Sequence, residues 1–149
     1  MRVSGVTAAG LATAIVLLSG CGGQAVAHTC SATDRLFIRQ ASLHMATVGS
    51  SGRDYLRGGG RAKDVIADTK RAAAVVMHTK PTDPSLERTR RLLGPMFNEY
   101  GRAILARERK RDPGPHILRA YGLANFAHDA LATAAPALKD RGCDVTGLL

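Results

Sequence analysis

Proline and glycine interrupt this chain at a few sites, and the segments between them limit what it can fold into. Each segment repeats apolar residues at steps of three and four, the period of a helix with one buried face. β-branched residues adjoin only briefly, as at Val75–Val76, whereas alanine, the strongest helix former, is abundant. The sequence therefore predicts an all-α fold with four helices, over about residues 31–49, 61–79, 84–110 and 115–141.

Capping residues mark the helix ends. Ser31 to Asp34 supplies capping oxygens and an acid for the first helix. Asp83–Pro84 opens the third helix with proline in its favoured first position. Gly142 fits the position after the last helix, where a left-handed conformation is common.

Three stretches are expected to break or bend a helix. Gly49–Gly52 should end the first helix, and residues 58–60, three glycines, mark a second break. Tyr55 and Leu56, between these stretches, are expected to form only a short helical turn. Pro95 should kink or break the third helix, because proline removes one backbone hydrogen bond and crowds the preceding turn.

The expected buried stripes are broad, and the fourth helix has the clearest one. Short connections between four such helices favour an antiparallel, up-down-up-down four-helix bundle. The stripes of the first, second and fourth helices comprise Leu36, Phe37, Ala41, Met45 and Val48; Val65, Ile66, Thr69, Ala73, Val76 and Met77; and Ile117, Tyr121, Ala124, His128, Leu131, Ala135 and Leu138.

The N-terminus looks like an export segment. One cation, Arg2, precedes an apolar run from Val6 to Leu18, which is too short for a membrane span. The residues that follow, Leu18-Ser19-Gly20-Cys21, resemble the lipobox of bacterial lipoproteins. That resemblance implies a signal peptide over residues 1–20, a diacylglyceryl group on the Cys21 sulfur, and a location on the extracytoplasmic face of the cell membrane. Residues 21–29 would then form a lipidated tether to a helical domain over residues 30–149.

The other two cysteines, Cys30 and Cys143, flank the helical segments. If Cys21 carries lipid, they form an even pair in an oxidising compartment, which favours a disulfide. A metal or redox site is the competing interpretation, but the chain contains no C-x-x-C motif. In an up-down-up-down bundle both chain ends lie at the same end, so the topology agrees with the disulfide.

The chain is strongly basic. Without Arg2, twenty Lys and Arg stand against twelve Asp and Glu, a formal charge of +8. The high Ala, Arg and Gly content is similar to that of small lipoproteins of high-GC Gram-positive bacteria. In that compartment positive charge favours anionic lipid headgroups or cell-wall polymers as contacts, and no nucleic acid is expected. The cations cluster at Arg88, Arg90 and Arg91 and over 107–111, either as a solvated helix face or as an anion-binding surface.

No motif points to catalysis, so we expect no enzyme activity and no catalytic residues. The five histidines form no H-x-x-x-H or E-x-x-H pair, so the prediction includes no metal ligands and no cofactor. His44 and His128, with Met45, are the best candidates for a ligand pocket between helices, although core histidines of this kind usually have a structural role.

Two classes of function stay open. The first is a membrane-anchored, non-enzymatic binding or interaction module of the cell envelope, with a protein or polymer partner. The alternative is a carrier of a small ligand, such as haem, a metal or an apolar molecule, between the helices. A large enclosed cavity would favour the carrier, and an apolar surface groove would favour the interaction module.

Overall fold

The computed structural model describes residues 29–149. The predictions for residues 1–20 and for the lipobox, including lipidation of Cys21, lie outside the described residues. Within 29–149 the chain forms four helices and no strand, which confirms the all-α prediction. The elements are α1 (Ala32–Leu56), α2 (Ala62–His78), α3 (Pro84–Glu108), α4 (Gly114–Asp140) and the 3₁₀ turn η1 (Thr146–Leu148).

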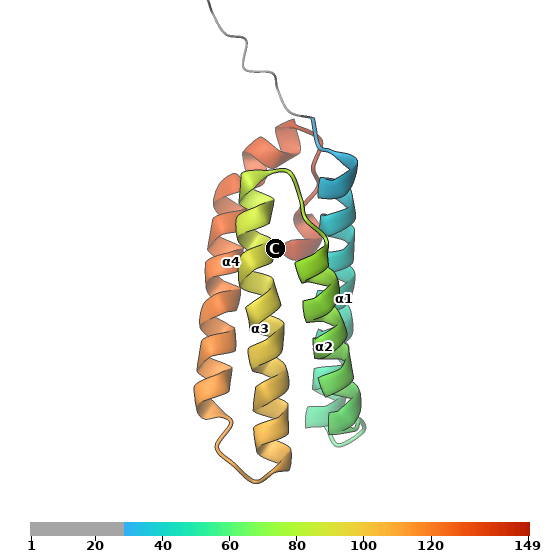
Figure 1. Cartoon of the computed structure of the whole chain (residues 1–149), viewed down its shortest axis with the longest axis vertical. Coiled ribbons are helices and arrows are strands. Elements are labelled where there is room, and N and C mark those ends of the chain that lie inside the picture. The colour runs from blue at the N-terminus through green and yellow to red at the C-terminus, as the bar shows by residue number, and fades with distance from the viewer. Residues whose placement is uncertain (1–28) are drawn as a thin grey trace, which may run out of the picture.

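The four helices pack as a bundle in sequential order. α1 packs on α2, α2 on α3, and α3 on α4. In Figure 1 their short connections lie at alternating ends of the molecule, and α1 begins at the end where α4 finishes. Within the described residues the backbones of α1 and α4 come close almost nowhere, and a groove lined by side chains of both helices lies between them. The C-terminal tail turns back into part of this opening, where η1 packs against α1.

The predicted helix caps are confirmed. The Ser31 hydroxyl accepts a hydrogen bond from the Asp34 backbone N–H, and the Asp34 carboxylate accepts one from the Ser31 N–H. Asp83 caps α3, with Pro84 as its first residue. At the far end of the chain Gly142 has a φ of 82°, and the Cys143 N–H donates to the Leu138 carbonyl. Local sequence therefore determines where these helices begin and end.

The predicted end of the first helix is wrong. α1 continues through Gly49–Gly52 to Leu56 and stops before Gly58, whose φ is 81°. Gly52 is buried, and the hydroxyl of Tyr100 from α3 occupies the space that a Cβ atom there would take. This tertiary contact compensates for the low helix propensity of glycine.

The third helix is not broken at Pro95, because α3 runs from Pro84 to Glu108 with this residue inside it. Pro95 and Arg91 are both exposed. The Arg91 carbonyl, which loses its helical partner to Pro95, therefore lies on a face that water reaches.

The core lies along the α2–α3 seam and the inner faces of α1 and α4. Its fully buried large side chains include Phe37, Phe97, Leu86, Leu131 and Leu138. Most of this core is Leu, Val, Ala and Met. Among residues 29–149, no helix has both the length and the hydropathy required to cross a bilayer.

The predicted stripe of α4 is only partly correct. Leu131 and Leu138 are buried, but Ile117, Tyr121 and His128 are exposed. The core instead takes Ala120 and Ala127, because α4 is apolar on several faces and no single stripe is defined by sequence. Leu36 of α1 and Met77 of α2, also expected in the core, are exposed as well.

Candidate functional site

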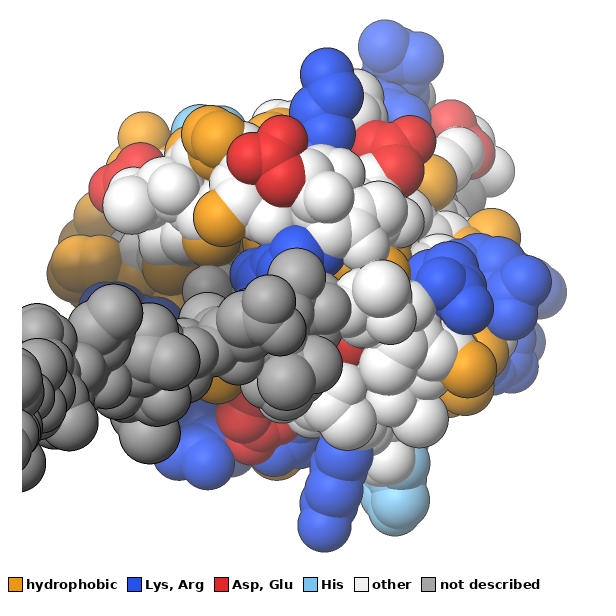
Figure 2. Space-filling model, turned by 90° about the horizontal axis from the view of Figure 1, so that it is seen from above, with side chains coloured by type: hydrophobic (Ala, Val, Ile, Leu, Met, Phe, Trp, Pro, Cys, Tyr) orange, Lys and Arg blue, Asp and Glu red, His pale blue; other side chains and the backbone are white. Residues whose placement is uncertain are grey.

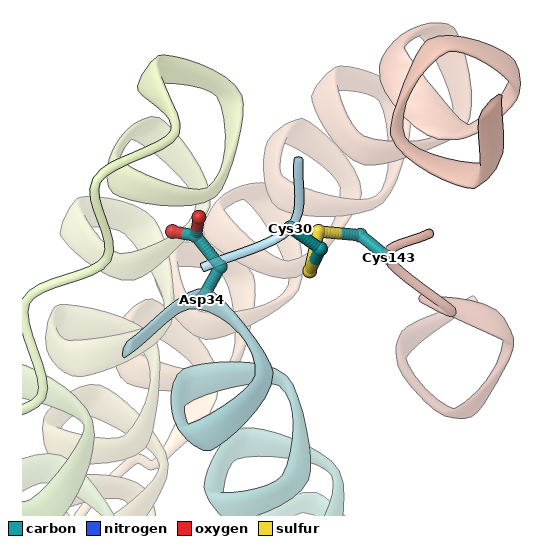
Figure 3. Close-up of side chains that lie close together, drawn as sticks. All are labelled: Cys30, Asp34 and Cys143. Atoms are coloured by element: carbon teal, nitrogen blue, oxygen red, sulfur yellow. A yellow bond between two sulfur atoms is a disulfide. The ribbon is translucent and has the colours of Figure 1, made fainter. Parts of the chain in front are cut away.

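A disulfide ties the two ends of the bundle domain together, as the sequence predicted. Cys30 and Cys143 are bonded and buried, with their Cα atoms 5.2 Å apart (Figure 3). The Cys30 N–H also donates a 2.8 Å hydrogen bond to the Arg141 carbonyl. The start of α1 is thus fixed to the end of α4. We call this end of the bundle the disulfide end.

Asp34 is the polar centre of the disulfide end. Its side chain accepts five hydrogen bonds, from the backbone N–H groups of Ser31, Thr82 and Asp83 and from two hydroxyls. Burial alone would raise the pKa of Asp34, but these hydrogen bonds outweigh it and lower the pKa to about 2. The carboxylate therefore joins α1 to the connection between α2 and α3.

The same three residues form a candidate metal cluster. The ligand atoms of Cys30, Asp34 and Cys143 lie within 4.8 Å of one another, and no other such group occurs within residues 29–149. The donor chemistry does not fit a metal ion, because the two sulfur atoms are bonded to each other and the Asp34 oxygens are already saturated with hydrogen-bond donors. The cluster therefore has a structural role, since it connects the start of α1 to the end of α4 and to the connection between α2 and α3.

The structure does not bring the candidate histidine pair into one ligand set. His44 is half-buried on α1, whereas His128 is exposed and lies on α4 beside the tail. In the described part of the chain no group of three metal-binding side chains contains either residue. Met45, the third member of the predicted set, instead lines the groove described below.

Glu99 is a buried carboxylate that pairs with partly exposed cations of α3 and α4. Its carboxylate lies 2.7 Å from Arg102, 2.7 Å from His116 Nδ1 and 3.0 Å from Arg119. The hydrogen bond with His116, followed by those with the arginines, lowers the pKa of Glu99 to about 2 although burial opposes the shift. Both carboxylate oxygens accept hydrogen bonds, so Glu99 links α3 to α4.

The first predicted basic cluster does not form a basic surface. Arg90 is buried, bonded to Glu87 through Nε and Nη2 and to the Met77 carbonyl through Nη1. Glu87 also pairs with the exposed Arg91 at 2.8 Å. Two of the three cations therefore pair with one carboxylate, and the bond from Arg90 to the Met77 carbonyl fixes α3 to the end of α2.

The second basic cluster belongs to a larger basic region. Residues 53–64 and 105–116, which include the α1–α2 and α3–α4 connections, carry eight Lys and Arg against four Asp and Glu. Both connections lie at the end of the molecule opposite the disulfide (Figure 1). We call this the basic end.

The disulfide end is balanced by comparison. Residues 29–35, 78–84 and 138–149 carry four Lys and Arg and four Asp and Glu. Figure 2 looks onto this end and shows basic side chains projecting on several sides, with acidic ones among them, instead of one basic patch. Positive charge is therefore concentrated at one end of the bundle.

An apolar groove lies where α1 and α4 fail to close, and we consider it the candidate binding site. Its floor is α3 and its volume is about 320 Å³, within the range of ligand sites. It is lined by Met45, Val48 and Gly49 of α1, Met96, Phe97 and Tyr100 of α3, and Ile117, Ala120, Tyr121 and Ala124 of α4. No charged side chain is among them.

The groove continues toward the C-terminal tail. A second hollow of about 240 Å³ shares Met45, Met96 and Ala124 with the first and ends at Leu148 and Leu149. From the level of Ile117 to that of Leu131, the two together follow α4 for about 21 Å, given a rise of 1.5 Å per residue. The second hollow is the more polar one, because Thr89, Asn125 and His128 also line it. We call the two adjoining hollows together the trough.

Sequence reasoning missed this groove because its lining was assigned to the core. Ile117 and Tyr121 are 49% and 65% exposed. The available signal was the uncharged run from Ala120 to Ala127, which is apolar on more than one face of α4. Such a helix has more apolar surface than one neighbouring helix can cover.

No protein-family model, curated protein or solved structure that was compared matches this chain.

Proposed function

We propose that this chain is a lipoprotein of the cell envelope that acts as a non-enzymatic binding or interaction module, with the apolar groove as its binding surface. The observation that carries this proposal is the open seam between α1 and α4, where apolar side chains from three helices line a groove of about 320 Å³. A bundle without a ligand or partner would gain stability by closing such a seam.

The proposed anchor is a diacylglyceryl group on Cys21, left after removal of residues 1–20 as a signal peptide. The lipobox-like residues Leu18–Cys21 support it. Two acyl chains suffice for stable membrane residence. In this arrangement residues 21–29 connect the membrane to the disulfide end, and α4, about 40 Å long, leads away from it to the basic end.

For the bundle we propose the antiparallel, up-down-up-down order. The disulfide between Cys30 and Cys143 supports it, because it holds the start of α1 beside the end of α4. The short connections between successive helices support it too.

Lipid labelling tests the anchor. We expect Cys21→Ala to abolish incorporation of labelled fatty acid and to release the protein from the membrane or stall its precursor. A Cys21→Ala protein that stays in the membrane and still takes up label would refute the anchor but not the groove.

Site-specific photocrosslinking in intact cells tests the groove as a binding surface. A photoreactive phenylalanine analogue at Tyr121, on the groove, should give discrete adducts. The same analogue at Leu43, which is 58% exposed on α1 and outside the groove lining, is the control. Equal adduct formation at both sites, or none at Tyr121, would contradict a binding role for the groove.

The second candidate function is a carrier of a small ligand. The ligand-sized volume and uncharged lining of the groove favour its apolar-molecule form. The haem and metal forms lack such support, since His44 and His128 belong to no ligand cluster among residues 29–149.

A further inference from the structure

We propose that the groove binds a single-chain anionic amphiphile, with its acyl chain along the α1–α4 trough and its carboxylate or phosphate head beside Arg53 at the basic end. This inference rests on the proposed function in one respect, that the groove is the binding surface. It adds the chemical class of the ligand and the direction in which it lies.

The trough matches a long flexible chain better than a compact ligand. It is about 21 Å long. Its lower hollow, toward the basic end, has an uncharged and mostly apolar lining, and its upper hollow, toward the C-terminal tail, combines apolar side chains with those of Thr89, Asn125 and His128. Met45 and Met96 lie where the two hollows meet. Unbranched thioether side chains adapt to ligands of irregular shape, which suits a chain of variable length.

Arg53 supplies a cation at the lower end of this trough. Its Nη1 atom lies against Gly49, 3.4 Å from the position a Cβ atom there would take, and Gly49 lines the groove. Arg53 is exposed, and none of the ion pairs within residues 29–149 includes it. A guanidinium in this state is available to an anionic head.

The Tyr100 hydroxyl is a second polar group at the same end. Tyr100 lines the groove, and its hydroxyl packs against Gly52, one helical turn after Gly49. Burial raises the pKa of Tyr100, so the hydroxyl stays protonated and keeps its proton for donation. Arg53 and Tyr100 thus contact neighbouring turns of α1, at Gly49 and Gly52, toward the basic end of the groove.

Charge favours this occupant over a second copy of the chain. The basic end carries eight Lys and Arg against four acids, so two copies meeting there would repel each other. An anionic head is attracted by the same field. A neutral apolar helix from another protein would fill the trough but leave the charge at its lower end without a partner.

The test uses the full chain in phosphatidylcholine vesicles and a hexadecanoate probe with a photoreactive diazirine near its methyl end. After irradiation, peptide mass spectrometry locates the adduct. We expect labelling of peptides from the upper hollow, near Leu131 or Leu148, because the head is held at the basic end. Labelling spread evenly over the chain, or confined to residues 1–28, would overturn the proposal.

Competitors separate head charge from chain, and one ligand source from another. Unlabelled hexadecanoate represents free fatty acid, a lysophosphatidate represents a phospholipid product, and hexadecanol has the chain without the charge. Competition by either anion with weak competition by hexadecanol supports the proposal, and the stronger anion identifies the source. Equal competition by hexadecanol, or none by either anion, overturns it.

Variants test the two parts of the site separately. Arg53→Gln should weaken probe binding about fivefold to tenfold, as expected for loss of one charge-assisted contact. Arg39→Gln, an exposed arginine on the same helix, should not change it. Ala124→Phe, at the junction of both hollows, should abolish labelling with an unchanged disulfide and circular dichroism spectrum. If Ala124→Phe does not fold, the Arg53→Gln and Arg39→Gln comparison decides alone, and equal binding by those two overturns the proposal.

These results are distinguishable from failure of the proposed function. If the groove crosslinks a protein in cells but ignores both anionic amphiphiles, the binding module stands and the amphiphile proposal falls. If Tyr121 gives no adduct in cells and the probe does not label the upper hollow, both fall.

Discussion

Replacement of Asp34 by asparagine gives the sharpest test of how the disulfide end is stabilised. Asp34→Asn keeps the size of the side chain but removes its charge and one of its two acceptor oxygens. The pKa of Asp34 is about 2 in the folded protein, against an ordinary value of 3.8. Each pKa unit corresponds to about 1.4 kcal/mol, so the charge contributes about 2 kcal/mol to folding at neutral pH.

The pH dependence follows from the direction of this shift. Because the folded pKa is the lower one, the contribution is complete above about pH 5 and disappears as the pH falls through 4 toward 2. Near pH 2 only a small part of the charge-dependent contribution remains. We therefore expect Asp34→Asn to cost about 2 kcal/mol at pH 7 and little near pH 2.

Urea unfolding at the two pH values measures the effect. With a slope of about 2 kcal/mol per molar urea, the midpoint should fall by about 1 M at pH 7. Asp54→Asn, the same change at an exposed site on α1, should leave the midpoint within about 0.3 M. An equal cost of Asp34→Asn at pH 7 and pH 2, or no cost at pH 7, would refute the reasoning.

Three further predictions concern the core, the disulfide and the contacts of Glu99 between α3 and α4. Leu131→Asp places an unpaired carboxylate at a site only 1% exposed and should cost more than about 4 kcal/mol, whereas Leu118→Asp, at a site 72% exposed, should change the thermal midpoint little. The disulfide with Cys30 closes a loop of 113 residues, so Cys143→Ser should lower the free energy of unfolding by up to about 4 kcal/mol. Non-reduced peptide mapping of the unsubstituted protein should show Cys30 linked to Cys143, and two alkylatable thiols there would contradict the disulfide. Glu99→Gln should lower the free energy of unfolding by about 2 to 3 kcal/mol at pH 7. Because the pKa of Glu99 is about 2 in the folded protein, chemical unfolding should show this difference shrinking as the pH falls from 4.5 toward 2. A difference that does not change with pH would argue against the charge cluster.

The starts of α1 and α3 and the end of α4 were determined by the sequence, because the groups that cap them lie within a few residues. Ser31 and Asp34 satisfy the first N–H groups of α1 wherever the helix packs, and Asp83–Pro84 does the same for α3. Gly142 adopts a positive φ that other residues avoid. The disulfide could also be predicted from the sequence, because Cys30 and Cys143 are the two cysteines that remain if Cys21 is lipidated.

What packs against what was decided by the tertiary structure. Gly49–Gly52 continues the helix, and Tyr100, from a helix far along the chain, fills the space beside Gly52. Arg90 is buried because it finds the Met77 carbonyl and Glu87 together. Neither contact could be predicted from a local sequence pattern, because each joins residues of different helices.

The groove is the clearest case of this limit. An apolar stripe shows which face of a helix avoids water, but α4 is apolar on several faces, and the neighbours of Ile117 and Tyr121 depend on how far α1 lies from α4. That separation is set by side-chain volumes across three helices and by the tail that fills one part of the opening. The sequence alone determined four helices, the caps at the starts of α1 and α3 and at the end of α4, and the disulfide. Only the packing of the helices determined that the bundle stays open.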